Sequence, residues 1–185
     1  LNKPRGVLTT ARDTHNRPTV YSVIGKGIPG LVNVGRLDRD SEGLLLFTTD
    51  GKLTFRLAHP KWEVKKVYRV TVKGKVTGEV IRRLSGGIEL EDGLTREAAV
   101  SITGKEKGGL TILDIEIHEG KKHIVRRMMS AVGLEVHVLR RIRYGPLELG
   151  DLEPSQWREL KSDEVEALKK AVGLGKQADD TAQAK

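Results

Sequence analysis

Short apolar runs bounded by glycine are frequent in the first third of this 185-residue chain. Three of them are too brief for helices and predict strands, at residues 6–10, 31–35 and 43–48. Residues 67–73 alternate, with Tyr68, Val70 and Val72 on one apolar face and mostly polar side chains on the other. This alternation predicts a strand that packs against a core on one side.

The second half of the chain adds further strands and a hairpin. Strands are predicted at residues 88–90, 94–102, 110–117 and 136–143. Asp92-Gly93 is a strong hairpin turn signal between the first two of these segments. Within residues 110–117 the apolar parity switches between Ile112 and Leu113, which predicts either a bulge or a strand buried on both faces.

Helical periodicity is clearest shortly after residue 120. One stripe there consists of Ile124, Val125, Met128, Met129 and Val132. Gly133 is placed to end this helix. Shorter helices are predicted at residues 18–24, 52–58 and 78–84, and a helix at 162–172 would have Ser162 as its N-cap. Strand-rich segments with interspersed helices predict an α+β fold, with a mixed, largely antiparallel β-sheet and flanking helices.

The composition excludes several classes of protein. Charged residues make up 31% of the chain, and no segment is apolar enough for a membrane span. The absence of cysteine excludes disulfides, thiolate zinc sites and cysteine nucleophiles. The five histidines include no i, i+4 pair, and no phosphate loop of the form G-x-x-x-x-G-K-[ST] is present. We expect a cytoplasmic protein without metal, cofactor or membrane contact.

Positive charge is unevenly distributed along the chain. The net charge is +8; residues 1–73 and 118–148 carry +8 and +4, whereas residues 74–117 and 149–185 carry −2 each. This distribution favours a basic face that binds a polyanion. The alternative interpretation is a generic soluble surface with an excess of lysine.

Residues 35–51, GRLDRDSEGLLLFTTDG, form the stretch with the most chemical information. Asp38 stands there in a polar loop between two predicted strands, a position where functional residues are common. Flanking cations should keep its carboxylate ionised, ready to act as a base or a nucleophile. On spacing alone, an ordinary charged turn is the simpler interpretation.

The same stretch resembles the signature of the RsuA family of bacterial ribosomal pseudouridine synthases, G-R-L-D, then S/T, then G-L-L-L-x-T-x-D-G. Further segments resemble the family in the same order within residues 1–160: LNKPRG at 1–6, KVY at 66–68, EGKKHIVRRM at 119–128 and RIRYGPL at 141–147. Residues 47–51 and 143–145 resemble the large-subunit, RluB-like members. The resemblance implies the pseudouridine synthase fold for this catalytic domain.

The resemblance also implies three catalytic residues. Asp38 matches the carboxylate that acts at the sugar, Tyr68 the active-site aromatic, and Arg126 the basic partner of that carboxylate. From the residues alone, Tyr68 could equally be a core tyrosine and Arg126 a solvated helical charge. Ile124 departs from the polar residue that the family usually has there, which puts one secondary contact in doubt. Candidate contacts to the RNA are Lys3, Arg5, Arg12, Arg17, Arg36, Arg39, Lys121, Lys122, His123, Arg127, Arg140, Arg141 and Arg143.

The implied reaction isomerises a specific uridine of ribosomal RNA, with 23S rRNA as the favoured target. The C1′–N1 bond is cleaved and C1′ is rejoined to C5 after the base has flipped out of its stack, without metal or cofactor. The same motifs would serve an enzyme acting on 16S rRNA or tRNA. A catalytically idle RNA-binding module is a further alternative.

The expected domain organisation follows from the same resemblance. Residues 1–160 form the catalytic domain, residues 161–173 a C-terminal helix and residues 174–185 a disordered tail. Family members commonly carry an RNA-binding S4 domain before the catalytic domain, and we expect that domain to be absent from this chain. The expected partner is ribosomal RNA, bound by a monomer.

Overall fold

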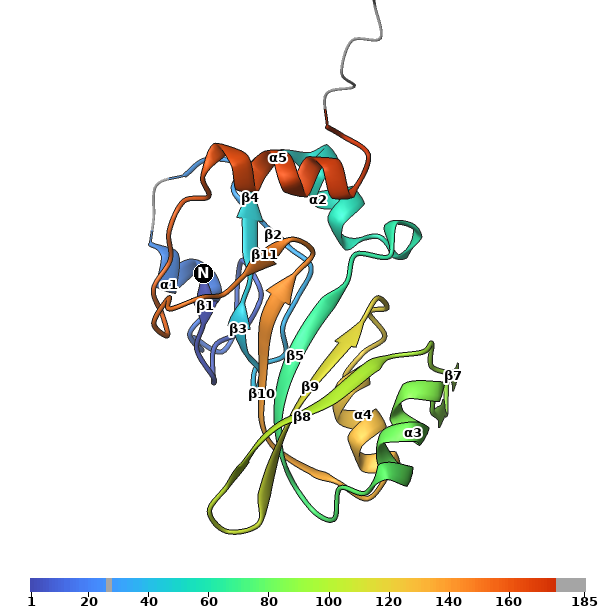
Figure 1. Ribbon diagram of the computed structural model, residues 1–185. Helices are drawn as coiled ribbons and strands as arrows, with labels where there is room; N and C mark the ends of the chain where they lie inside the picture. Colours follow the sequence, from blue (N-terminus) through green and yellow to red (C-terminus); the bar gives the residue numbers. More distant parts are fainter. Residues whose placement is uncertain (26–27, 176–185) are drawn as a thin grey trace, which may run out of the picture.

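A seven-stranded sheet forms the centre of the molecule in the computed structural model, which describes residues 1–25 and 28–175 (Figure 1). Its order is β1 (Asn2–Lys3), β3 (Glu42–Leu44), β10 (Glu135–Tyr144), β5 (Lys66–Lys73), β9 (Leu110–Ile117) and β8 (Ala99–Glu106), with β11 (Leu147–Glu148) paired to β10. Neighbouring strands are antiparallel except for the parallel pair of β3 and β10. The predicted mixed, largely antiparallel sheet is confirmed.

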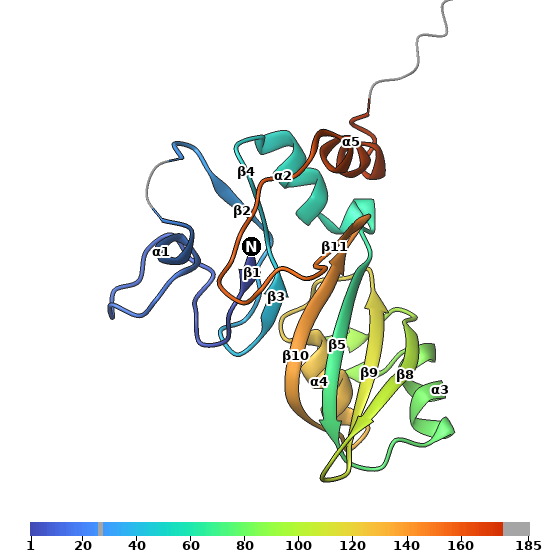
Figure 2. The same cartoon turned by 60° about the vertical axis from the view of Figure 1, so that its left-hand side comes forward.

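Two short ladders and several helices surround this sheet. The ladders are β2 (Val32–Val34) with β4 (Leu46–Thr48), and β6 (Glu89–Leu90) with β7 (Gly93–Leu94). The helices are α1 (Val20–Ile24), α2 (Gly51–Ala58), the 3-10 turn η1 (Pro60–Trp62), α3 (Gly78–Gly86), α4 (Ile124–Ala131) and α5 (Ser162–Ala171). Helices α3 and α4 cover one face of β8, β9, β5 and β10, while α2 and α5 lie at the other end of the molecule (Figures 1 and 2).

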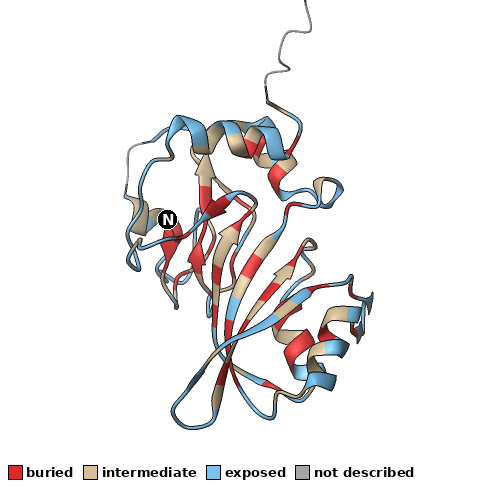
Figure 3. Cartoon of the chain, in the orientation of Figure 1, coloured by how far each residue is buried: buried red, intermediate tan, exposed pale blue. Residues whose placement is uncertain are grey.

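Buried residues follow the central strands and the inner faces of the helices (Figure 3). Val70 and Val72 of β5 and Met128 of α4 have no exposed surface and belong to one hydrophobic cluster. The alternation of residues 67–73 therefore predicts the correct inner face, because Val67 and Arg69 line the opposite side of the sheet. A separate cluster around Leu37 and Leu45 anchors the loop that carries Asp38.

Two predicted strands near the N-terminus are wrong or incomplete. Residues 6–10 form no strand; Leu8 makes only an isolated bridge to Thr19. Residues 43–48 form two strands in different sheets, β3 and β4, divided at Leu45. The close approach of β3 to β10 explains why glycine is needed in this run, since a Cβ at Gly43 would lie 2.3 Å from the Arg141 carbonyl oxygen.

The C-terminal half follows its sequence pattern more closely. The hairpin around Asp92-Gly93 is present as β6 and β7, but the following strand begins at Ala99 and not at residue 94. Strand β9 alternates regularly in burial, and the predicted irregularity lies in its partner β8, between Ile102 and Gly104. The N-cap of α5 is Lys161, one residue before the predicted Ser162. Most of the predicted tail, at 176–185, lies outside the described residues.

Candidate active site

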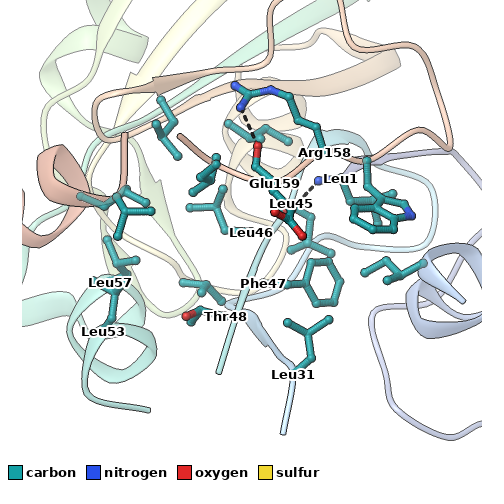
Figure 4. Close-up of a pocket in the computed structure, with 18 of the residues that line it drawn as sticks. Leu1, Leu31, Leu45, Leu46, Phe47, Thr48, Leu53, Leu57, Arg158 and Glu159 are labelled. Carbon is teal, nitrogen blue, oxygen red and sulfur yellow. Dashed lines mark hydrogen bonds between the residues drawn. The ribbon is translucent and has the colours of Figure 1, made fainter. Parts of the chain in front are cut away.

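An apolar cavity of about 310 Å³ lies between β3, β4, α2 and the segment that leads into α5 (Figure 4). Leucines such as Leu46, Leu53 and Leu57 line most of it, and Arg158 and Glu159 stand at one side. Asp38, Tyr68 and Arg126 do not line this cavity. Its mostly apolar lining offers little for acid–base chemistry.

A larger and more polar cavity of about 600 Å³ brings four parts of the chain together. They are the loop after β2, the first half of β5, the segment before α4, and β10. The polar and aromatic side chains that line it are Arg36, Asp38, Ser41, Lys66, Tyr68, Glu119, Lys121, Lys122, His123, Arg141 and Tyr144. The cavity thus contains two of the three predicted catalytic residues.

The loop after β2 holds Asp38 on a fixed backbone. Next to it, Leu37 is buried, and its carbonyl accepts a hydrogen bond of 2.7 Å from the Thr9 hydroxyl. The carbonyl of Asp38 itself accepts from the Ser41 backbone N–H at 3.1 Å. The Asp38 side chain remains 38% exposed, so its carboxylate is accessible from the cavity.

The imidazole of His123 lies next to that carboxylate. Its Nε2 lies 3.3 Å from Asp38 Oδ1. His123 directly precedes α4 and has a φ of 53°, a left-handed conformation that is uncommon outside glycine. The sequence predicts His123 as an RNA contact, but the structure places it beside Asp38.

Arg126 does not pair with the Asp38 carboxylate as the resemblance implies. Its Nη2 donates instead a hydrogen bond of 2.9 Å to the backbone carbonyl of Asp40. This bond ties α4 to the turn that follows Asp38. In this structure Arg126 therefore fixes the Asp38 loop through the backbone.

Tyr68 reaches the cavity from β5 and is partly buried. Its hydroxyl is 3.5 Å from Nη1 of Arg141, a weak contact. Arg141 is only 2% exposed, donates from Nε to the Leu44 carbonyl at 2.8 Å and stacks over the Tyr144 ring at 4.9 Å. Arg141 is thus part of the cavity wall and is not a solvated side chain, and its contact with RNA stays a prediction.

Lys3 is a second predicted RNA contact that the structure buries completely. Its Nζ donates to the carbonyls of Ser41, Pro4 and Arg39 at 2.7, 3.0 and 3.3 Å. Burial lowers its pKa to about 8, although the carboxylates of Asp38, Asp40 and Glu42 partly oppose this shift. Lys3 therefore clamps the backbone on the far side of the Asp38 loop.

The burial of Lys3 predicts a pH effect on stability. Its folded pKa of about 8 lies below the ordinary value of 10.5, so the unfolded chain binds more protons between these values and stability rises with pH. We expect the free energy of unfolding to gain about 1–2 kcal/mol from this residue between roughly pH 7.5 and 9.5. Urea unfolding of Lys3→Met should show a smaller rise than the parent; equal rises would contradict the assignment.

Several other predicted RNA contacts are engaged in ion pairs. Arg140 lies 2.5 Å from Glu42, and Arg143 pairs with Glu116; both line the face of the sheet away from Asp38. Lys121 and Arg127 hold the β6–β7 hairpin through its carbonyls and the Asp92 carboxylate. Arg17 pairs with Asp13 at 2.6 Å. Exposed basic residues remain available near the loop, namely Arg5, Arg12, Arg36, Arg39 and Lys122.

Within residues 1–25 and 28–175, no group of three or more His, Asp or Glu side chains is arranged to hold a metal ion. None of the helices in the described part of the chain is long and apolar enough to cross a bilayer.

A family model for RNA pseudouridylate synthase matches residues 1–131. The chain belongs to this family. An uncharacterized RNA pseudouridine synthase of Aquifex aeolicus (strain VF5) is 46% identical over 176 residues, which cover 94% of this chain and 70% of the relative. The ribosomal large subunit pseudouridine synthase B of Bacillus subtilis (strain 168) is 42% identical over 180 residues, or 96% and 73% of the two chains.

Structural comparison agrees with the sequence relationship. A crystal structure of a pseudouridylate synthase superimposes with a TM-score of 0.78 at 32% identity, covering 91% of this chain and 71% of the other. The protein is therefore an RNA pseudouridine synthase, an isomerase with an RsuA-like catalytic domain. The family and the fold expected from the sequence motifs are both confirmed.

Sequence reasoning missed four polar or aromatic residues of this pseudouridine synthase cavity: Ser41, Lys66, Glu119 and Tyr144. A signal for Lys66 is present, because it precedes Tyr68 by two residues on a strand and so shares its face. Tyr144 gives no such signal. Its hydroxyl donates to the Leu57 carbonyl at 2.7 Å, a contact across 87 positions of the chain.

Proposed function

We propose that this enzyme converts a uridine of 23S rRNA to pseudouridine, with Asp38 acting on the sugar of the target nucleotide. The observation that carries the proposal is the accessible Asp38 carboxylate in a polar cavity, beside His123 and the ring of Tyr68. The large-subunit target is supported by the name of the Bacillus subtilis relative. Asp38 would serve either as a base at the sugar or as a nucleophile at C1′.

The reaction needs a flipped base, because C1′ and C5 of a stacked uridine are out of reach. A cavity of about 600 Å³ has room for one nucleotide. Tyr68 would offer its ring to the uracil, while the backbone clamps from Lys3 and Arg126 would keep Asp38 in position at the sugar. The chemistry balances internally, since the C1′–N1 and C5–H bonds are exchanged for the C1′–C5 and N1–H bonds.

Exposed basic residues at the cavity would bind RNA phosphates. Affinity should then fall with salt, with a slope of log K against log[salt] of about −0.7 per single-strand phosphate neutralised. Arg36 and Lys122 are exposed and line the cavity. We expect Arg36→Ala or Lys122→Ala to make the slope shallower by about 0.7 in a filter-binding titration.

Lys170→Ala is the matched control for this titration, because Lys170 is exposed on α5 and does not line the cavity. Its slope should equal that of the parent. Equal slopes for all three variants would mean that RNA phosphates do not approach the cavity through Arg36 and Lys122.

The experiment that tests the proposed target is pseudouridine mapping of total RNA from cells with and without the gene. One 23S rRNA position should lose pseudouridine in the deletion and regain it when the gene is restored. A lost site in 16S rRNA or tRNA would reassign the substrate. No lost site in any RNA would favour the catalytically idle RNA-binding module.

A further inference from the structure

Lys66 is a cation of the cavity that the reaction described so far does not use. It begins β5 on the same face as Tyr68 and lines the cavity together with Asp38. Its Nζ lies 5.6 Å from the centroid of the Tyr144 ring. Within residues 1–25 and 28–175, its ammonium group has no hydrogen bond or ion pair, so all three of its donors are available.

The neighbouring lysine shows how unusual this position is. Lys65 is 66% exposed in its side chain, and its Nζ pairs with the Glu116 carboxylate at 2.8 Å. Glu116 lines the opposite face of the sheet. The two consecutive lysines thus differ sharply. Lys65 is neutralised at the surface by a carboxylate, whereas Lys66 is half-buried and has only the Tyr144 ring near its ammonium group.

The titratable and charged groups that line the cavity together with Lys66 come from every wall of it. They are Tyr68 of the same strand, Arg36 and Asp38 of the loop after β2, Glu119, Lys121, Lys122 and His123 of the segment before α4, and Arg141 and Tyr144 of β10. Burial, with a smaller contribution from Arg141, lowers the pKa of Lys66 to about 8. The side chain is therefore mainly charged at neutral pH and loses its charge in mildly alkaline solution.

The chemistry of the isomerisation creates a need for such a cation. When the C1′–N1 bond breaks, its electron pair stays on the uracil, and the detached base is an anion whose charge is shared by N1, O2 and O4. The rotated base then forms the C5–C1′ bond with an electron pair of its ring. On the nucleophile route the Asp38–C1′ ester bond breaks in this step; on the base route the C1′=C2′ double bond of the glycal is consumed, and Asp38 returns its proton to C2′. C5 afterwards loses its proton and N1 gains one, so the product is an isomer of the substrate. Both routes open to Asp38 pass through this anion.

We propose that the ammonium group of Lys66 binds the carbonyl oxygens of the detached uracil and stabilises its negative charge until the new bond forms. The proposal rests on the cavity being the place where Asp38 acts. A lysine suits the task because its charge sits on a flexible stem with three donors and can follow the oxygens as the base turns. A stabiliser of developing charge acts more strongly in a cavity than in water.

The experiment measures single-turnover formation of pseudouridine in whichever RNA the parent modifies. Lys66→Met should lower the rate at pH 7.5 by roughly 10²-fold, the usual loss for one donor to a developing anion. Lys65→Met is the matched control and should stay within about twofold of the parent, since its ion pair lies on the other face. Circular dichroism and melting curves verify that both variants are folded.

A pH profile separates catalysis from a merely structural role. The parent rate should fall above about pH 8, where Lys66 loses its proton. Lys66→Arg should recover at least tenfold over Lys66→Met and move the alkaline fall to higher pH, because a guanidinium stays charged. In Lys66→Met the alkaline fall should be clearly smaller than in the parent, because only the titration of Lys3, whose pKa is also about 8, is common to both proteins.

A modified substrate tests the leaving group directly. Fluorine at C5 stabilises the uracil anion, so 5-fluorouridine at the target position should need Lys66 less. Mass spectrometry of digested RNA measures the rate at which the original C1′–N1 bond is cleaved. With the fluorinated substrate, the parent should cleave this bond less than about tenfold faster than Lys66→Met.

The proposal is wrong if Lys66→Met runs within threefold of the parent with an unchanged pH profile. It is also wrong if Lys66→Arg is as slow as Lys66→Met at every pH. The proposed function fails through different results, namely an active Asp38→Asn variant or a modified site outside 23S rRNA. Each of these outcomes can be recognised independently of the others.

Discussion

Asp38→Asn is expected to abolish pseudouridine formation, with a loss of about 10³-fold or more in single-turnover rate. Asparagine keeps nearly the same volume but cannot take a proton from the sugar or attack C1′. The loop should keep its shape, because Leu37, Thr9 and Ser41 hold it through backbone contacts that do not involve the Asp38 carboxylate. RNA binding should therefore persist while turnover is lost.

The neighbouring aspartate provides a matched control for this variant. Asp40 is exposed, and it is its backbone carbonyl that accepts the hydrogen bond from Arg126. Asp40→Asn keeps that carbonyl and should leave turnover within about threefold of the parent. Turnover of Asp38→Asn within tenfold of the parent would remove Asp38 from the mechanism.

Much of the fold was accessible from hydrophobic periodicity. Residues 67–73 and 110–117 become β5 and β9 with nearly the predicted bounds, and the stripe from Ile124 becomes the buried face of α4. These segments are long enough for period 2 and period 3.6 to be distinguished. Residues 6–10 are apolar but too short, and the chain there is held by a bridge and by side-chain contacts that no local pattern records.

The limits of the sequence are clearest for the basic residues. Lys3 and Arg141 are charged and lie near motif positions, yet both are almost fully buried. Their burial depends on backbone carbonyls supplied by distant segments, such as Ser41 for Lys3 and Leu44 for Arg141. A charge count treats a buried, hydrogen-bonded cation and a solvated one alike, so it overestimates the RNA-binding surface.

The side-chain contacts around Asp38 could not be predicted from the sequence either. The resemblance places Asp38, Tyr68 and Arg126 in one site, but the direction of each side chain is set by tertiary contacts. His123 comes to 3.3 Å from Asp38 because the chain turns through a left-handed residue immediately before α4. Arg126, three residues later on the helix, reaches the Asp40 carbonyl. Neither outcome follows from spacing along the chain.

Two adjacent arginines of β10 differ in burial, and this difference predicts different effects on stability when each is replaced. The sequence predicts the same role for Arg140 and Arg141, whereas the structure places them on opposite faces of the sheet. The Arg140 side chain is 43% exposed and pairs with Glu42, so its replacement affects a solvent-screened ion pair. Arg141 is 2% exposed, and its charge is enclosed by the Leu44 carbonyl and the Tyr144 ring.

We expect Arg141→Glu to lower the free energy of unfolding by about 3–5 kcal/mol, because a buried carboxylate would face a carbonyl oxygen and the electron-rich face of an aromatic ring. Arg140→Glu, opposite Glu42 at the surface, should cost about 1 kcal/mol or less. Urea unfolding followed by circular dichroism gives both values on proteins that differ by one position. Similar losses in the two variants would mean that Arg141 is not enclosed, and its place in the cavity wall beside Tyr68 would have to be abandoned.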